Sequence, residues 1–242
     1  MKHPKPPYCF MTYNIRKGKG ANRGHPELHE IIQQIQVQQP DILLCQEVAQ
    51  YHGESPQKQD EHFAALLDMH HCYAPNAFFE HRNHGNACYS KLPISCHTNF
   101  NVSTNIFERR GILLSELMLP HTTLFVFNVH FGLTPMQRRL QAKALETLIH
   151  QEVPPESPII VAGDFNDISG WVDRHLQKTE GFKSALADLD RNDRMTWSSR
   201  NPVLALDRIY YRHLTVHSVE VLKGALWETL SDHLPLKMLF SV

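Results

Sequence analysis

Apolar and polar residues alternate along the chain in two rhythms. Short apolar runs bounded by turn-forming residues are typical of buried strands, whereas apolar residues three and four positions apart are typical of helices. The first rhythm predicts strands over residues 10–15, 41–47, 86–90, 111–119, 123–130, 158–163, 204–211, 215–222 and 234–242.

The second rhythm predicts helices between these runs. Apolar residues of the segment 27–38 recur at i, i+3, i+4 and i+7, with Pro26 near its start and Pro40 after its end. A second helix is predicted around residues 63–67. A third begins after Thr134, where Pro135 and Gln137 complete a capping-box pattern.

The predicted strands and helices are interleaved from one end of the chain to the other. No linker, repeat or low-complexity segment separates them, so residues 1–242 are expected to form a single domain. Continuous apolar runs mixed with alternating ones favour an α/β protein in which helices cover β-sheets. The order of the strands stays open at this point.

Composition limits the kinds of binding partner and the cellular location that we expect for this protein. The formal net charge of −1 argues against a protein that coats nucleic acid through bulk charge, although a local basic groove remains compatible with it. The five cysteines are odd in number and have no CxxC spacing, which favours free thiols. No segment approaches the ~20 apolar residues of a membrane span. We therefore expect a cytoplasmic protein without a transmembrane segment.

Several apolar runs end in a residue that can do chemistry. Asn14, Glu47 and His130 close three of them, and Asp164 and Asn166 follow a fourth. Asp207 lies at the start of another apolar run, and Asp232 and His233 come just before the terminal one. Because α/β scaffolds commonly build their sites at strand ends, we expect these side chains to converge.

The residue types favour one kind of chemistry. Oxygen donors from Asn14, Glu47, Asp164 and Asp232 suit Mg²⁺ or Mn²⁺ better than zinc. The chain has no P-loop, no GxSxG elbow and no Cys-x₅-Arg phosphatase loop. Metal-activated water is therefore the best candidate nucleophile.

The order of these motifs resembles the endonuclease/exonuclease/phosphatase superfamily, which includes deoxyribonuclease I, abasic-site endonucleases, sphingomyelinases and inositol-polyphosphate 5-phosphatases. The matching segments span residues 12–236 and are TYNI, CQEV, GNACYSKLPI, RRG, NVHF, AGDFND, LDRIYY and SDHLPL. The segments YNIRKG and LALDRIYY look most similar to a small bacterial branch of endonucleases sometimes found beside cardiolipin synthases. The resemblance implies two packed β-sheets flanked by helices, a four-layer α/β sandwich like that of deoxyribonuclease I, and a monomer.

The resemblance also implies a divalent-metal site. Glu47 matches the principal metal ligand, Asn14 an amide beside the metal and the phosphate, and Asp232 a carboxylate near the metal. Mg²⁺ is the implied cofactor, with Mn²⁺ as the alternative. Abasic-site endonucleases carry an acid two residues after the asparagine, where this chain has Arg16, so a second metal is not expected there.

The catalytic roles implied by the resemblance fall on five residues. Asp164 matches the carboxylate that orients or deprotonates the attacking water, and Asn166 matches an amide that holds a phosphate oxygen. His130 matches the side chain that stabilises the charged phosphorane or assists the leaving group. His233 matches the histidine facing the scissile phosphate, as base or acid, and Asp207 matches the carboxylate that orients it.

Four further residues are candidates for binding the substrate, namely Arg16, Asn86, Arg110 and Trp197. Arg16 and its neighbour Lys17 follow the first strand and are suited to a phosphate. Trp197 lies in the segment MTWSS, which resembles a substrate-facing loop of the family. Taken alone, Asn86 is explained better by a turn, and Arg110 is explained better by a solvated pair with Arg109 than by a phosphate contact.

Each residue taken alone has a structural explanation. Asn14 could cap a turn, His130 could be a hydrogen-bonded core histidine, and Asp167 reads as a turn residue or a cap for a helix near Trp171. The joint occurrence in order favours a phosphoesterase. Three hypotheses remain: a nuclease acting on DNA or RNA, a phosphoesterase acting on phospholipid headgroups or small phosphate esters, and a non-enzymatic binding module. The third is disfavoured by an intact set of site residues, namely Glu47, His130, Asp164, Asn166, Asp207, Asp232 and His233.

Overall fold

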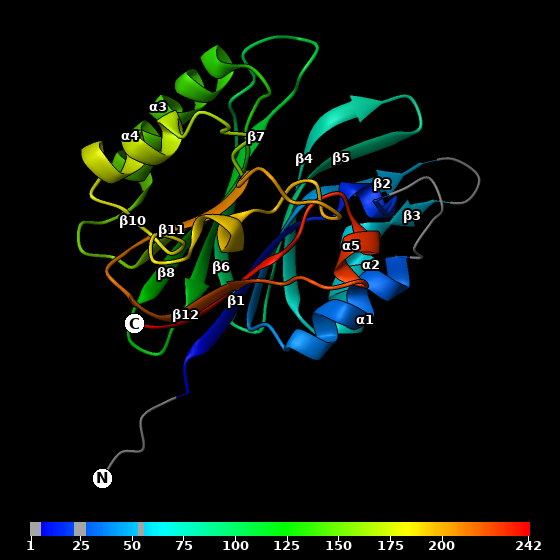
Figure 1. The fold of residues 1–242 in the computed structure, drawn as a ribbon, viewed down its shortest axis with the longest axis horizontal. Coiled ribbons are helices and arrows are strands. Elements are labelled where there is room, and N and C mark those ends of the chain that lie inside the picture. The colour runs from blue at the N-terminus through cyan, green and yellow to red at the C-terminus, as the bar shows by residue number, and fades with distance from the viewer. Residues whose placement is uncertain (1–5, 22–27, 53–55) are drawn as a thin grey trace.

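Two β-sheets pack face to face, and helices cover the outer face of each (Figure 1). This computed structural model describes residues 6–21, 28–52 and 56–242. The arrangement is the four-layer α/β sandwich that the family resemblance implied.

The first sheet has seven strands. Six follow the order β12-β13-β1-β2-β5-β4, and β3 pairs with β2 outside this path. Its strands are β1 (Tyr8–Asn14), β2 (Ile42–Tyr51), β3 (Gln57–Lys58), β4 (His70–Phe79), β5 (Arg82–Ser90), β12 (Thr215–Val221) and β13 (Leu236–Ser241). β1 and β2 are parallel, and the other pairs in the sheet are antiparallel.

The second sheet has six strands in the order β10-β11-β9-β8-β7-β6. They are β6 (Ile94–Asn101), β7 (Gly111–Met118), β8 (Thr123–His130), β9 (Ile159–Asp164), β10 (Lys183–Ser184) and β11 (Asp207–Arg212). Here β8 and β9 are the parallel pair. Each sheet therefore has one parallel pair at its centre, whose strands end on the same side.

Helices on each outer face bury apolar residues against the neighbouring sheet. The first sheet carries α1 (Leu28–Gln38), α2 (Gln59–Leu67) and α5 (Trp227–Leu230), and the second carries α3 (Pro135–Glu152) and α4 (Trp171–Thr179) (Figure 1). Ile31, Ile32 and Ile35 of α1 join the core of the first sheet. Leu145 of α3 and Leu176 of α4 pack in the core of the second sheet.

A layer of buried polar side chains joins the two sheets. The amide nitrogen of Gln46 donates to Thr12 and to Asn128 (3.0 and 2.8 Å), and the amide of Asn128 donates to the carbonyls of Cys45 and Ala87. Asn86 belongs to the same layer, because its amide nitrogen donates to the carbonyl oxygens of Gly111 and Asn128, both at 3.1 Å.

Asn86 corrects a prediction made from the sequence. Its side chain is 1% exposed and already bonded to backbone on the opposite sheet, so it does not face a substrate. A buried amide with both bonds satisfied within the protein stabilises the fold. The sequence was also compatible with Asn86 as a turn residue. In the structure its side chain bridges the two sheets.

The predicted strands are all present, and all but the strand over residues 123–130 have shifted ends. The strand predicted over residues 41–47 continues to Tyr51. Gln46 and Glu47 form a bulge between Cys45 and Val48, and pairing with β5 resumes after it. The run predicted as 204–211 begins its strand at Asp207. Helix α1 begins in the described residues at Leu28, and Glu27 and Pro26 lie outside them.

Four strands were not predicted, and two of them are long. β6 is exposed along most of its length and lies at the edge of its sheet, so it lacks an apolar alternation. β4 also lies at an edge and contains two histidines, an asparagine and a proline. Edge strands pair on one side only, so their residues need not be apolar. β3 and β10 have two residues each.

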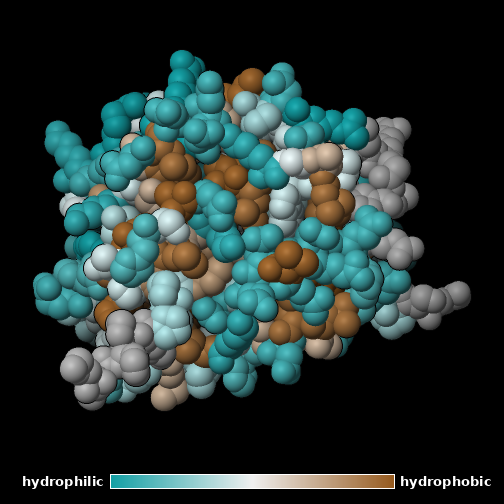
Figure 2. All heavy atoms as spheres, turned by 60° about the horizontal axis from the view of Figure 1, so that its bottom comes forward, coloured by the Kyte–Doolittle hydropathy of each residue, from teal (hydrophilic) through white to brown (hydrophobic). Residues whose placement is uncertain are grey.

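No helix among the described residues is long and apolar enough to cross a membrane. On the face turned forward in Figure 2, hydrophobic residues form separate groups between hydrophilic ones.

Candidate active site

The candidate residues meet where the central strands of both sheets end. Asn14 is the last residue of β1 and pairs with Gln46 of β2. His130 and Asp164, the last residues of β8 and β9, pair with each other. Asp207, the first residue of β11, pairs with Asp164 from the other side. The fold thus brings residues from five strands to one edge of the sandwich.

His233 lies between two buried carboxylates. Its Nδ1 is 2.8 Å from Oδ2 of Asp207, and its Nε2 is 3.6 Å from Oδ2 of Asp164. The three side chains are 8%, 1% and 2% exposed. The hydroxyl of Thr196 accepts hydrogen bonds from the backbone N–H groups of Leu206 and Asp207, which holds Asp207 in position.

This arrangement changes the proton affinity of both neighbours. Burial alone would lower the pKa of His233, but the charges of Asp207 and Asp164 outweigh it and raise that pKa to about 10. Burial raises the pKa of Asp164 above its usual range, although the charge of His233 opposes the shift. His233 is therefore an imidazolium near neutral pH, and Asp164 is a carboxyl group with an unusually high affinity for protons.

Asp164 is also the meeting point of three other groups. The amide nitrogen of Asn14 donates to its Oδ2 (3.1 Å), and Nε2 of His130 lies 3.6 Å from the same oxygen. The backbone N–H of Asn166 donates to its Oδ1 (2.9 Å). Burial lowers the pKa of His130 well below its usual value, so this imidazole is neutral. A neutral and a charged imidazole thus face the same carboxylate.

Glu47 is turned toward the site by the bulge in β2. It adopts a left-handed backbone conformation, with φ of 58°, and its carboxylate forms an ion pair with the ammonium of Lys17. Burial opposes ionisation of Glu47, but His130 and Lys17 outweigh this effect and lower its pKa to about 2. Because His130 is neutral, we attribute the stabilising charge to Lys17.

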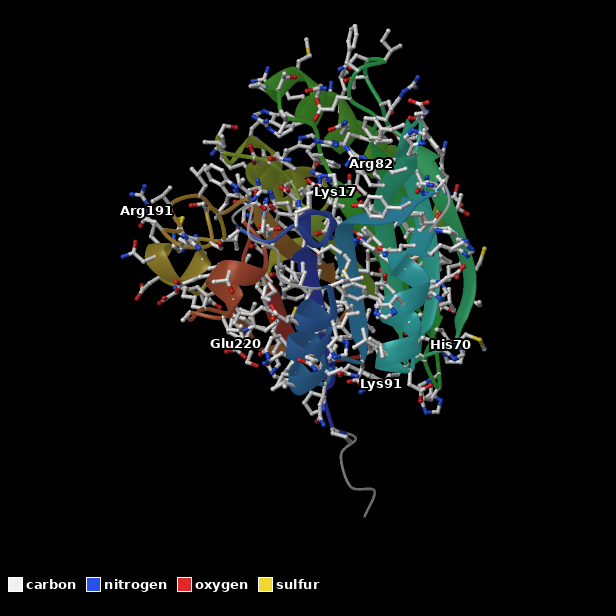
Figure 3. The ribbon with its side chains drawn as sticks, turned by 90° about the vertical axis from the view of Figure 1, so that its right-hand side faces the viewer. Lys17, His70, Arg82, Lys91, Arg191 and Glu220 are labelled. Atoms are coloured by element: carbon white, nitrogen blue, oxygen red, sulfur yellow. The ribbon has the colours of Figure 1, made fainter. Side chains whose placement is uncertain are left out.

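The loop after β1 also contacts Asp232. Nε of Arg16 lies 3.4 Å from Oδ2 of Asp232, and its Nη1 donates to the carbonyls of Gly20 and Ala21. Both Arg16 and Lys17 have positive φ (48° and 60°), so the loop turns sharply and directs consecutive side chains to different carboxylates. Figure 3 shows Lys17 toward the same end of the molecule as Arg82, with His70 and Lys91 toward the other.

Two sets of donors are candidates for holding a divalent cation. Asp164, Asp207 and His233 have one ligand atom each within 4.8 Å of one another, but a metal would need His233 neutral, against its raised pKa. Glu47 and Asp232 both contact a cationic side chain, and together with Asn14 they offer oxygen donors only. Oxygen donors that already attract positive charge fit Mg²⁺ or Mn²⁺ better.

The other three residues predicted to contact a substrate differ in burial and in hydrogen-bond partners. Arg16 is half-exposed beside Asp232. Arg110 is largely buried, with Nη2 2.6 Å from Oε1 of Glu108 and Nε donating to the carbonyl of Phe131. Trp197 is half-buried, and its backbone pairs with His233. Arg110 and Trp197 therefore adjoin the site, while their contact with a substrate stays a prediction.

Two residues near the site were not among the candidates. Lys17 was considered only as a phosphate contact beside Arg16, and its pairing with Glu47 requires the bulge in β2, which no sequence pattern indicated. His84 lies in β5 with its pKa lowered to about 4 by burial and by the charge of Lys17. The alternation of histidine with small residues in HGNAC is the signal that could have found it.

Comparisons with known proteins identify a family and a shared fold. An uncharacterized protein of Escherichia coli (strain K12), YbhP, is 31% identical over 242 residues, covering 95% of this chain and 94% of its own length. An endonuclease/exonuclease/phosphatase structure from Beutenbergia cavernae has a TM-score of 0.81 at 18% identity, covering 98% of this chain and 72% of that one.

Two further solved structures have the same fold. A mannosyl-6-phosphatase of Bacteroides thetaiotaomicron superposes with a TM-score of 0.75 at 18% identity, covering 97% of this chain and all of that one. D. rerio TDP2, solved with a single strand DNA product, superposes with a TM-score of 0.71 at 14% identity, covering 97% and 99%. The model of the Endonuclease/Exonuclease/phosphatase family matches residues 11–233, and the chain belongs to that family.

Proposed function

We propose that this protein is a divalent-metal-dependent phosphoesterase that hydrolyses phosphodiester bonds of nucleic acid with activated water. The observation that carries the proposal is the buried series Asp207–His233–Asp164, with His130 on the same oxygen of Asp164. One ring nitrogen from neutral His130 and one from charged His233 point at the carboxylate of Asp164. This arrangement suits proton transfer next to a developing negative charge.

Each residue has a role in this reaction. The carboxylate of Asp164, which has an unusually high proton affinity, takes a proton from the attacking water. His233, kept protonated by Asp207, donates to a phosphate oxygen on which negative charge builds. Asn166 and neutral His130 bind other phosphoryl oxygens. Asn14 keeps Asp164 oriented through its amide bond.

The metal would be held by Glu47, Asp232 and Asn14. Mg²⁺ or Mn²⁺ there would withdraw charge from the phosphate as a Lewis acid. Glu47 is ionised far below neutral pH and Asp232 is held by Arg16, so both carboxylates are available as anionic ligands once these cations are displaced.

Nucleic acid is the substrate class we favour, with phospholipid headgroups or small phosphate esters as the alternative. The structure of TDP2 with a single strand DNA product supports the first, and the mannosyl-6-phosphatase supports the second. We further propose a single-domain monomer located in the cytoplasm. All five cysteines are free, as expected in a reducing compartment.

The test is hydrolysis by the purified protein of supercoiled plasmid, abasic oligonucleotide, RNA and dispersed phospholipid, with Mg²⁺, Mn²⁺ or chelator. Asp164→Asn and Glu47→Ala are the variants, and Asp188→Asn, an exposed carboxylate outside the site, is the matched control. We expect metal-dependent cleavage of nucleic acid, lost in both site variants and kept in the control.

The outcomes separate the alternatives. Release of headgroup or phosphate from lipid without cleavage of nucleic acid would replace the favoured substrate class. Cleavage that survives Asp164→Asn would refute the role of Asp164. If no substrate is hydrolysed, the hypothesis of a non-enzymatic binding module would be favoured.

A further inference from the structure

A cavity of about 430 Å³ lies beside the proposed active site, between the end of β4 and the segment 101–110 that connects β6 to β7. These two segments lie at the top of the molecule in Figure 1. None of the catalytic or metal-binding roles proposed above uses this cavity, apart from the contact predicted for Arg110.

Aromatic and aliphatic side chains form one part of the cavity wall. Phe107, Ile106 and Phe78 are 93%, 72% and 69% exposed, and Phe79 is 52% exposed. Four large hydrophobic side chains left in water around one cavity are unusual for an isolated monomer and typical of a binding site. Phe79 contacts the guanidinium of Arg82 and stacks on the ring of His84, so Phe107 and Phe78 are the rings left for a ligand.

Polar groups form the rest of the wall. Asn76, Asn99 and Asn101 line it, and the amide of Asn99 donates to Oδ1 of Asn76. Asn76 and Asn99 lie so close to Gly111 that a Cβ there would be 2.0 Å and 2.6 Å from their side-chain oxygens. The amides are therefore packed in place. Fixed amides beside exposed rings suit a planar, hydrogen-bonding ligand better than an acyl chain.

The charge of this region favours an anion. Arg109 is exposed and forms no ion pair with any residue that the structure describes. Arg82 stands at the end of the β4–β5 hairpin (Figure 3). Glu108 neutralises Arg110. Exposed Glu80, whose carboxylate lies 3.6 Å from His81, sets one negative charge against the two positive charges of Arg82 and Arg109, so the region keeps one net positive charge.

The cavity is connected to the catalytic residues through one carbonyl group. Phe131 O accepts from Nε of Arg110 (3.2 Å) and from Nδ2 of Asn166 (3.0 Å). Arg110 lines the cavity, and Asn166 is the proposed phosphate amide. A chain of phosphates that passes Asn166 would therefore continue toward Arg109, with its bases beside Phe107 and Phe78.

We propose that this cavity binds unpaired nucleobases of a single-stranded nucleic acid whose adjacent phosphodiester lies at the active site. The proposal rests on the proposed function and narrows its substrate class. Unpaired bases have free faces for stacking on Phe107 and Phe78 and free edges for the amides, whereas paired bases have neither to the same degree.

The test is binding of fluorescent 12-nucleotide probes in chelator, followed by anisotropy. The probes are an oligothymidine strand, a strand of the same length without bases and a duplex. We expect Phe107→Ala and Phe78→Ala to weaken oligothymidine binding by about tenfold and to leave the base-free strand unchanged. Arg109→Gln should weaken both strands. Val37→Ala, which removes an equally exposed apolar side chain on α1, is the control.

Unchanged oligothymidine binding in Phe107→Ala and Phe78→Ala would overturn the proposal. So would phenylalanine-dependent binding of phosphatidylserine vesicles without strand binding, which would make the region a membrane contact. Hydrolysis of bis-p-nitrophenyl phosphate, too small to reach the cavity, is measured in parallel. If the wild-type protein does not hydrolyse this compound, the result counts against the proposed function alone, because strand binding in chelator requires no catalysis.

Discussion

His233 shows how a single side chain acquires its chemistry from its neighbours. Histidine has an ordinary pKa near neutrality, and burial by itself would make this one neutral. Two carboxylates, one at each ring nitrogen, reverse that effect. His130 is equally buried, but Arg110 and His233 add to the desolvation effect, and it becomes neutral. Two histidines of one site thus hold opposite protonation states for an identifiable reason.

Replacement of Asp207 tests this account. In the wild-type protein, the raised pKa means that His233 stays protonated through neutral pH and loses its proton only toward a pH of about 10. Asp207→Asn removes the main stabilising charge, so we expect the pKa of His233 to fall by about one unit or more. Titration of the ring by ¹⁵N NMR measures it. A His233 pKa that is unchanged in Asp207→Asn would contradict the assignment, and Asp188→Asn is the control.

Lys17 is predicted to compete with the metal. The ammonium of Lys17 forms an ion pair with the carboxylate of Glu47, so a metal cation that binds Glu47 must displace Lys17. Lys17→Met should therefore strengthen Mn²⁺ binding by about fivefold, which corresponds to about 1 kcal/mol for a partly exposed ion pair. Calorimetry with Mn²⁺ alone measures this. Exposed Lys19 gives the matched control Lys19→Met, and weaker Mn²⁺ binding in Lys17→Met would refute competition.

At the scale of elements, the segment after β9 separates catalytic from structural acids. Asp164 ends the strand, whereas Asp167 turns away from the site and accepts hydrogen bonds from the N–H groups of Trp171, Val172 and Asp173. These groups begin α4, so the sequence-based interpretation of Asp167 as a helix cap is confirmed. α3 likewise begins with the predicted capping box of Thr134 and Gln137.

Asp167→Ala should therefore affect stability and leave catalysis intact. Loss of the buried cap is expected to reduce the free energy of unfolding by about 1–2 kcal/mol. Urea denaturation measures the change, and the turnover of the folded variant is compared with that of Asp164→Asn. A large loss of turnover at unchanged stability would show that Asp167 acts in the site instead.

At the scale of the whole molecule, the polar layer between the sheets sets how the two halves of the site meet. Gln46 and Asn128 come from strands of different sheets and bond to each other at 2.8 Å. Gln46 precedes Glu47, and Asn128 lies two residues before His130. Hydrogen bonds are directional, so this layer permits one alignment of the sheets where an apolar interface would permit several.

Asn86→Ala tests this role. The substitution leaves the carbonyls of Gly111 and Asn128 without this donor, and we expect a loss of about 2–4 kcal/mol in the free energy of unfolding. Thermal and urea denaturation measure it, with the exposed Asn192→Ala as control. If Asn86→Ala instead weakens substrate binding at full stability, the original substrate-binding prediction would be reinstated.

Local periodicity was sufficient for the nine predicted strands and for α1, α2 and α3, because burial imposes the pattern that the sequence carries. It did not predict α4 and α5, which are short. It was also sufficient to single out the polar residues closing those elements, Asn14, Glu47, His130 and Asp164 among them. It missed β4 and β6, since edge strands exposed to water carry no such pattern. The four-layer arrangement came from resemblance to a family, because the order of strands leaves no local trace.

Only the tertiary structure decided which groups face one another. Asn14 and Asp164 are bonded across 150 positions, and Asp207 orients His233 across 26. Lys17 reaches Glu47 only because a bulge turns that glutamate, and Asn86 points inward only because a second sheet offers it two carbonyls. Proton affinities, metal competition and the cavity beside the site all depend on such distances, which packing sets and sequence spacing does not.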